Sequence, residues 1–271
     1  MYRAKLPKIS IAILLIVVFI SIFGSFIYSV SPYEFNKNAI LQAPSLNHLM
    51  GTDRLGRDIL ARVIKGSQAS LIIGVGSALV ASLIGLFYGV IAGYFKGLWD
   101  KSFVFVVDIF LTFPTFFLLL TLVSYIEASS LILIIVIAIT GWMGTARLIR
   151  SQSYKIASMP YIKVLKIAKI PTYKIVLKYF LPLLGPIFFI SFSFGVSGAI
   201  LAESGLSYLG LGITPPNMSW GSILSSGKSV MEIAWWVSFF PGLMIFLVTF
   251  SLIQVSDYLQ EYFNQKEIIG Q

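Results

Sequence analysis

The sequence predicts an all-α, polytopic membrane protein with six transmembrane helices. Of its 271 residues, 57% are apolar and only 11% are charged, and the mean hydropathy is +0.89. A soluble domain carries about 25% charged residues, more than twice this fraction, so a soluble globular protein is excluded. A disordered chain is excluded as well, because it needs charge to stay solvated. The third observation is a series of six apolar stretches, most of them near the roughly 20 residues that a helix needs to cross the hydrocarbon layer.

The six expected spans follow one another along the whole chain. They are Ile9–Val30, Ser70–Tyr94, Phe103–Val123, Ser130–Gly144 (extensible to Leu148), Leu181–Leu201 and Ala234–Val255. The first is too long for the apolar region of a signal peptide, so we expect it to be retained as a helix. The expected divisions are a tail with the first helix at 1–30, an outer segment at 31–69, a five-helix core at 70–258 with a cytosolic loop at 149–180, and a tail at 259–271.

The distribution of positive charge predicts the orientation. Six spans place both termini on one side of the membrane. With the termini inside, the inner segments carry 14 lysines and arginines and the outer segments carry six. Cytosolic segments are the ones enriched in these residues, so both termini are expected in the cytoplasm. The net charge of +9 is then explained by these segments and by anionic lipid, and nucleic acid is not an expected partner.

The sequence offers little material for catalysis or for binding a metal or a cofactor. It contains no cysteine and one histidine, His48, which argues against thiol chemistry and against a nitrogen-ligand metal site. The segment Gly221–Ser229 looks like a phosphate-binding loop. It has five residues where the Walker pattern requires four, and it follows no predicted strand. We therefore expect no catalytic residue, metal or cofactor on this chain.

Small residues recur at every fourth position of the second span. They are Ser77, Ala81, Gly85, Gly89, Gly93 and Gly97. Spacing by four places them on one helix face, and close backbone approach is what allows helices to pack in lipid. Gly85, Gly89 and Gly93 are therefore predicted to contact another helix tightly.

Two carboxylates fall within the expected spans. Asp108 lies six residues before Pro114 in the third span, and Glu203 lies at the outer end of the fifth. A carboxylate inside a membrane is costly unless it is paired or wetted. Asp108, Pro114 and Glu203 are therefore candidates for a path or gate. The alternatives are that Asp108 anchors one helix to another, and that solvation at the interface accounts for Glu203.

The outer segment contains a run, Gly51–Asp58, with two aspartates, two arginines and two glycines. This composition predicts a tight turn held by local ion pairs. Metal binding by the aspartates with His48 is the less favoured alternative, because the arginines compete for the carboxylates.

The loop between the fourth and fifth spans is strongly basic. Three of its lysines recur every three residues: Lys163, Lys166 and Lys169. This spacing predicts that they follow one side of a short helix, with three apolar residues mainly turned away: Ile162, Leu165 and Ile167. Pro171 would end this helix and begin another. The resulting helix–turn–helix either docks a cytosolic partner or rests on anionic lipid.

Three separated blocks resemble those of a known family. They are Gly51–Asp58 continuing to Arg62, Gly66 and Ser70-Leu71, then Asp108 with Thr112–Pro114, and Glu203–Pro216 followed by Ser219–Gly221. In these blocks the chain is similar to the C-type permease subunits of ABC importers in the dipeptide/oligopeptide/nickel family. The resemblance implies the transmembrane domain of a type I ABC importer, which is a non-catalytic permease.

The same family carries an EAA motif, E-A-A-x3-G-x9-I-x-L-P, in the basic loop. Counted back from Leu181-Pro182, Lys163 takes the place of the glutamate and Lys169 that of the glycine, and Tyr179 replaces the isoleucine. The resemblance implies that the following residues couple the chain to an ATPase: Tyr161, Lys163, Val164, Leu165, Lys166, Ala168, Lys169, Pro171, Leu181 and Pro182. With the frame otherwise intact, we expect acidic residues in the ATPase groove to match these lysines; loss of coupling is the alternative.

The resemblance also implies partners and a location. The partners are a second permease subunit, two ATPase subunits that hold ATP and magnesium, an external solute-binding protein and membrane lipid, in a bacterial inner membrane. Peptides are the expected substrate, and nickel or its chelates are the alternative. An ion-coupled secondary transporter would need several mid-membrane acids, of which only Asp108 is present. A membrane hydrolase would need facing catalytic groups, which the spans lack.

Overall fold

The computed structural model describes residues 6–269, excluding the side chains of 264–269, and within this part the regular elements are helical. They are α1 (Lys8–Ile27), η1 (Lys37–Ala39), α2 (Ile59–Phe95), α3 (Gly97–Thr112), α4 (Thr115–Ser124), α5 (Ser130–Ser158), α6 (Pro160–Ile167), α7 (Thr172–Ile175), η2 (Val176–Phe180), α8 (Leu181–Tyr208), α9 (Trp220–Gly227), η3 (Lys228–Val230) and α10 (Trp236–Ile269). Five helices of the described part are long and apolar enough to span a membrane, or six if α3 and α4 form one bent span. The predicted all-α class is confirmed.

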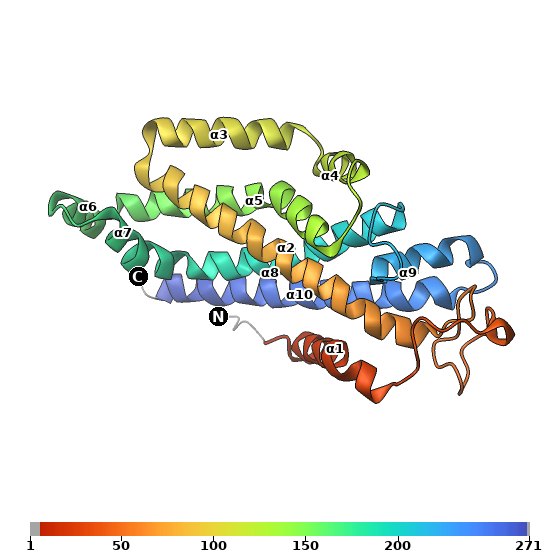
Figure 1. The fold of residues 1–271 in the computed structure, drawn as a ribbon. Helices are drawn as coiled ribbons and strands as arrows, with labels where there is room; N and C mark the ends of the chain where they lie inside the picture. Colours follow the sequence, from red (N-terminus) through yellow and green to blue (C-terminus); the bar gives the residue numbers. More distant parts are fainter. Residues whose placement is uncertain (1–5, 270–271) are drawn as a thin grey trace.

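Four long helices form the centre of the molecule. α2 packs chiefly against α5, and α8 packs against both α2 and α10. α1 lies on one side of this bundle, and α3 with α4 lies on the opposite side (Figure 1). α6 and α7 lie at one end of the bundle, called the α6 end below. α9 and the segment before α2 lie at the other, called the α9 end.

Three helices extend further than the apolar stretches predict. α2 begins at Ile59, where the Asp58 side chain accepts a hydrogen bond from the backbone N–H of Ala61 at 2.9 Å. α5 continues to Ser158, and α10 continues through most of the expected tail at 259–271. Neither extension contains a proline or glycine, so nothing stops α5 before the residue that precedes Pro160. The loop expected at 149–180 therefore begins inside a helix.

The third expected span is broken. α3 and α4 meet at an angle of 78°, so the expected span Phe103–Val123 consists of two helices joined by a sharp bend. Pro114 causes the break, because it lacks a backbone donor and disfavours helical geometry at the residue before it. Phe113 accordingly adopts an extended conformation, with φ −89° and ψ 134°.

The small-residue face of α2 lies against α5. A Cβ added at Gly89 would approach the backbone oxygen of Ala146 to 2.7 Å, and one added at Gly85 or Gly93 would also meet α5 atoms. Gly97 is an exception to the expected stripe. It begins α3 with φ +60°, and a Cβ there would meet no atom within 4 Å. Close packing of the stripe therefore ends at Gly93.

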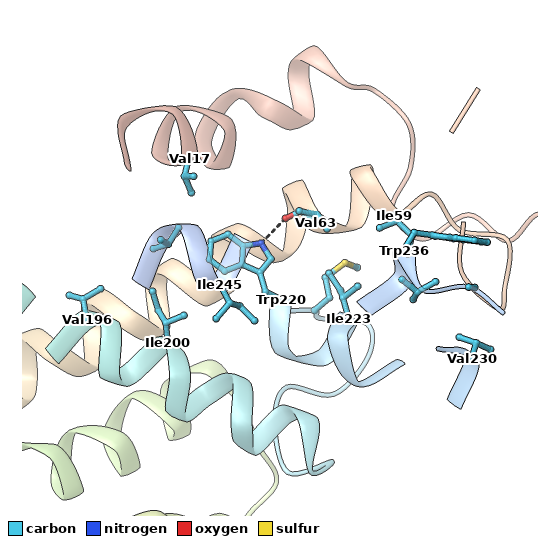
Figure 2. Packing of buried hydrophobic residues seen from close by; sticks show 14 of the residues in the cluster. Val17, Ile59, Val63, Val196, Ile200, Trp220, Ile223, Val230, Trp236 and Ile245 are labelled. Carbon is cyan, nitrogen blue, oxygen red and sulfur yellow. Dashed lines mark hydrogen bonds between the residues drawn. The ribbon is translucent and has the colours of Figure 1, made fainter. Parts of the chain in front are cut away.

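The largest apolar cluster lies toward the α9 end. Trp220, at the start of α9, is fully buried, and its indole N–H donates to the backbone oxygen of Val63 on α2 at 3.1 Å (Figure 2). Val17 of α1, Ile200 of α8 and Ile245 of α10 belong to the same cluster. One tryptophan therefore lies in a cluster to which five α-helices contribute.

Candidate functional site

The predicted helix–turn–helix is present as α6, the turn after it and α7; we call these residues, 160–175, the basic hairpin. Ile162 of α6 and Ile175 of α7 are fully buried. They pack in a cluster with Ile149 of α5, Phe180 of η2 and Leu184 of α8. The hairpin is therefore fixed to the ends of α5 and α8, and α10 ends at the same end of the molecule.

The other side of α6 is apolar and exposed. Tyr161, Val164 and Ile167, spaced by three, share this side, and Val164 and Ile167 are 63% and 81% exposed. Of the three apolar residues expected to turn away from the lysines, Ile162 and Leu165 pack inward, whereas Ile167 is exposed. Residues three apart share a helix face, and only the face of Ile162 and Leu165 meets the cluster.

The three lysines of the hairpin have different surroundings. Lys163 and Lys166, three apart in α6, share a side of that helix as predicted, whereas Lys169 does not belong to the helix. Lys163 is exposed and forms no ion pair with any described residue. The ammonium of Lys166 lies 3.9 Å from the ring centre of Tyr94 on α2. Burial lowers the pKa of Lys166, and repulsion from Lys96 lowers it further. Lys169 lies beyond the end of α6.

Lys169 adopts a left-handed backbone conformation, with φ +54°. Its N–H donates to the Lys166 oxygen at 3.0 Å, and the N–H of Ile170 donates to the Leu165 oxygen at 3.1 Å. These bonds close the helix in the way usually associated with glycine. Lys169 occupies the place of the glycine in the EAA frame. The left-handed conformation that suits glycine is therefore present here at a lysine, which adopts it less readily.

At the α9 end, the run Gly51–Asp58 forms the predicted ion-paired turn. Asp53 is almost fully buried and accepts hydrogen bonds from the backbone N–H groups of Leu55 and Arg57 at 2.8 and 3.0 Å. The Arg57 guanidinium donates to the same carboxylate at 2.7 Å. Arg54 forms no part of this pair and donates instead to the backbone oxygen of Ser229 at 3.0 Å.

The second carboxylate of the turn, Asp58, is also fully engaged. Besides capping α2, it accepts a hydrogen bond from the Tyr28 hydroxyl at 3.0 Å and lies 2.9 Å from Nδ1 of His48. Burial, together with the hydrogen bond and charge of Asp58, raises the pKa of Tyr28 to about 12. The described residues contain no cluster of metal ligands. The two aspartates therefore stabilise the turn and the start of α2.

Glu203 lies in a buried serine cluster. It is fully buried and accepts hydrogen bonds from the hydroxyls of Ser207 at 2.7 Å and Ser219 at 2.6 Å. Solvation at the interface, the explanation considered from the sequence, therefore does not apply. Ser219 also caps α9, so this carboxylate ties the end of α8 to the start of α9.

Two carboxylates of α3 pair with arginines of α5. Asp108 forms an ion pair with Arg147, and Asp100 forms a two-point contact with Arg150. Both arginines were counted among the 14 cations of the inner segments, and these pairs were not predicted. The available signal was the presence of two aspartates just before and within the third expected span, and of two arginines at the inner end of the fourth. The geometry matches the anchoring alternative for Asp108.

Three cavities follow α8 from the α9 end toward the α6 end, with volumes of about 800, 190 and 520 Å³. The middle and last cavities share three wall residues: Gly141, Thr145 and Gly195. Asp108, Pro114 and Glu203 line none of the three, although Thr115, next to Pro114, lines the middle one. The walls of the middle and last cavities consist mainly of small, hydroxyl and apolar side chains of α2, α5 and α8.

Comparison with known proteins identifies relatives over nearly the whole chain. Residues 85–268 match the family described as binding-protein-dependent transport system inner membrane component. The oligopeptide transport system permease protein OppC of Haemophilus influenzae is 32% identical over 96% of this chain and 85% of its own length. The dipeptide transport system permease protein DppC of Bacillus subtilis is 32% identical over 97% of this chain and 84% of its own length.

A solved structure shares the fold. The methionine ABC transporter MetNI, in an inward-facing conformation, matches with a TM-score of 0.52 and 15% identity, over 74% of this chain and 97% of the matched chain. At this identity the likeness concerns the arrangement of the helices alone. It agrees with the expected fold, that of an ABC importer transmembrane domain.

Proposed function

The chain belongs to the family of binding-protein-dependent transport system inner membrane components, and from this premise we propose that it is one of two permease subunits of an importer of di- or oligopeptides. The observation that carries the substrate is the near full-length similarity to permeases named for oligopeptide and dipeptide transport. The chain itself performs no chemistry in this proposal. ATP and magnesium bind to two separate ATPase subunits, and an external binding protein delivers the peptide.

The basic hairpin is the proposed contact with an ATPase subunit. Its exposed apolar side, with Tyr161, Val164 and Ile167, suits an apolar groove, and the unpaired Lys163 suits an acidic residue at the groove's edge. Its opposite side is anchored beneath α5 and α8 by Ile162 and Ile175. A displacement of the hairpin would therefore be transmitted directly to α5 and α8.

The row of cavities along α8 supports a substrate path between this chain and the second permease. Packed helices have a few discrete arrangements, and a partner that binds one of them more tightly shifts the population toward it. ATP-driven closure of the ATPases would open the path toward the α9 end, and hydrolysis would reopen it toward the α6 end. The break at Pro114 gives α3 and α4 a place to hinge, while the Asp108–Arg147 pair holds α3 on α5.

The proposed location is a bacterial inner membrane, with the α6 end and both termini in the cytoplasm. The excess of lysine and arginine on that side supports this orientation. The proposed division of the chain keeps an outer segment at 31–69 and a five-helix core at 70–258. Within the core, the element that contacts the ATPase is the basic hairpin, 160–175, which is shorter than the loop expected at 149–180.

Reconstitution tests the proposal. The chain is co-purified with the second permease and the ATPases encoded beside it, placed in proteoliposomes, and supplied with the binding protein and a labelled tripeptide. We expect uptake that requires both ATP and the binding protein. Uptake of nickel instead of peptide would contradict the substrate, and uptake by the chain alone under an ion gradient would contradict the ABC mechanism.

A further inference from the structure

The cavity at the α9 end has a composition of its own. Its volume is about 800 Å³, within the range of small-molecule sites. The charged side chains in its wall, among the described residues, are two arginines, Arg57 and Arg62, and no acidic residue lines it. The cavity therefore presents positive charge at the end of the molecule where the proposed substrate arrives.

Arg62 is buried with one of its donors unpaired. It is 5% exposed, and its Nε has no hydrogen-bond partner. This nitrogen lies 3.6 Å from the nearer oxygen of Asp53, and Nη1 donates to the Pro32 oxygen at a long 3.5 Å. A guanidinium carries five N–H donors, and leaving them unpaired in a buried site is costly.

Asp53 does not satisfy both arginines. Its carboxylate already accepts four hydrogen bonds or short ionic contacts from the 51–58 turn, two of them from the Arg57 side chain. One carboxylate thus faces two guanidinium groups. The cavity lacks a second anion, and a carboxylate is the group whose two oxygens match a guanidinium.

The rest of the wall suits a short peptide. Tyr33 and Phe35 come from the segment before α2, and Ile213, Pro215 and Met218 come from the loop between α8 and α9. These surfaces can bury apolar side chains, whereas a single acidic side chain of a docking protein would need far less room. The volume and the mixed lining therefore favour a small ligand over a protein side chain.

We infer that Arg62 and Arg57 bind the terminal carboxylate of the transported peptide in this cavity before it enters the path along α8. The inference rests on the proposed peptide substrate and adds a requirement that the proposal lacks: a free carboxylate. It makes the permease, and not only the external binding protein, selective for the end of the peptide.

The test compares a labelled tripeptide with its C-terminal amide in the reconstituted transporter. The affinity of the binding protein for each peptide is measured separately, and the ratio of the two uptake rates is corrected for any difference in that affinity. Loss of a charge-assisted hydrogen bond costs about tenfold or more, so the wild-type complex should favour the free acid by at least about tenfold. Arg62→Gln and Arg57→Gln should reduce this preference to within about twofold. Arg54→Gln, in the same turn but outside the cavity, should retain it.

Each other outcome has a definite meaning. A preference unchanged in both cavity variants overturns the site. Equal loss of uptake for acid and amide, with the ratio unchanged, assigns the arginines to a carboxylate of the binding protein and overturns the substrate role. If Arg62→Gln fails to assemble, the partly exposed Arg57→Gln decides. Absence of uptake of both peptides by the wild type overturns the proposed function and this inference with it.

Discussion

The two ends of the molecule are built in opposite ways. At the α9 end, three carboxylates are buried and paired within the chain: Asp53 with its turn, Asp58 with Tyr28 and His48, and Glu203 with serines. At the α6 end, the hairpin exposes Val164 and Ile167 and leaves Lys163 without an ion-pair partner among the described residues.

This difference indicates that the α9 end stabilises the fold, whereas the outer side of the hairpin binds a partner. Buried, fully bonded polar groups specify one arrangement of the helices they join. Exposed apolar and unpaired charged groups on one short helix contribute little to the isolated chain and suit a partner's surface. Substitutions at the α9 end should therefore reduce folding, and substitutions on the outer side of the hairpin should reduce coupling with little loss of stability.

The largest effect is expected at Trp220. Trp220→Ala removes a fully buried indole and its bond to Val63, which should lower the free energy of unfolding by about 3–5 kcal/mol. Unfolding in an SDS titration of the purified complex measures the loss. Trp235→Ala is the matched control, because that ring is 52% exposed and should change stability by less than about 1 kcal/mol. Equal losses would contradict the stabilising role assigned to burial of Trp220.

A smaller loss is expected where α2 meets α5. Gly89→Ala places a Cβ against the Ala146 oxygen and should cost about 1–3 kcal/mol by overpacking. Gly185→Ala on α8 is the control, because its Cβ would meet no atom within 4 Å. The same titration measures both, and an unchanged midpoint for Gly89→Ala would show that the two helices separate easily.

At the hairpin, two lysines sharpen the comparison. Lys163→Glu should reduce the ATPase stimulation by peptide-loaded binding protein about tenfold, the effect of one reversed charge at an interface, while the SDS unfolding midpoint stays unchanged. Lys166→Glu should instead affect stability slightly and stimulation little, because Lys166 lies over Tyr94. Full stimulation in the Lys163 variant would contradict the docking role.

The smallest expected effect is an increase in stability. Lys169→Gly relieves a left-handed lysine and should stabilise the turn after α6 by about 1 kcal/mol or less. Amide hydrogen exchange in the hairpin measures it as slower exchange. Lys174→Gly, the same substitution within α7, should have the opposite sign, because glycine weakens a helix. Faster exchange in both variants would refute the strain assigned to Lys169.

Much of the fold could be predicted because it follows from local chemistry. Apolar runs of the required length indicated the spans, and the four-residue spacing of Gly85, Gly89 and Gly93 indicated the face that lies on α5. The ion-paired turn at 51–58 was predictable because its charges are neighbours in sequence. Helix ends were less predictable, because α5 and α10 continue as polar helices after their apolar stretches end.

The site was predicted less completely because its contacts join distant segments. Glu203 meets Ser219 only because α9 folds back beside α8, and Arg150 meets Asp100 only because α3 lies along α5. The spacing placed Lys166 on the same side of α6 as Lys163, but it could not show that Lys166 contacts the ring of Tyr94 on another helix. Such pairings are set by tertiary packing rather than by sequence spacing.

The wide π-type turn of η2, Val176–Phe180, joins α7 to α8. A π segment absorbs one additional residue within an otherwise α-helical run, whereas each residue of an α-helix advances the chain by about 100°. Deletion of one residue inside η2 would leave the orientation of the hairpin unchanged and would only bring the hairpin slightly closer to α8. The same deletion within α8 would swing the hairpin about a quarter turn around the bundle. Length variation should therefore be tolerated at this joint and penalised on either side of it.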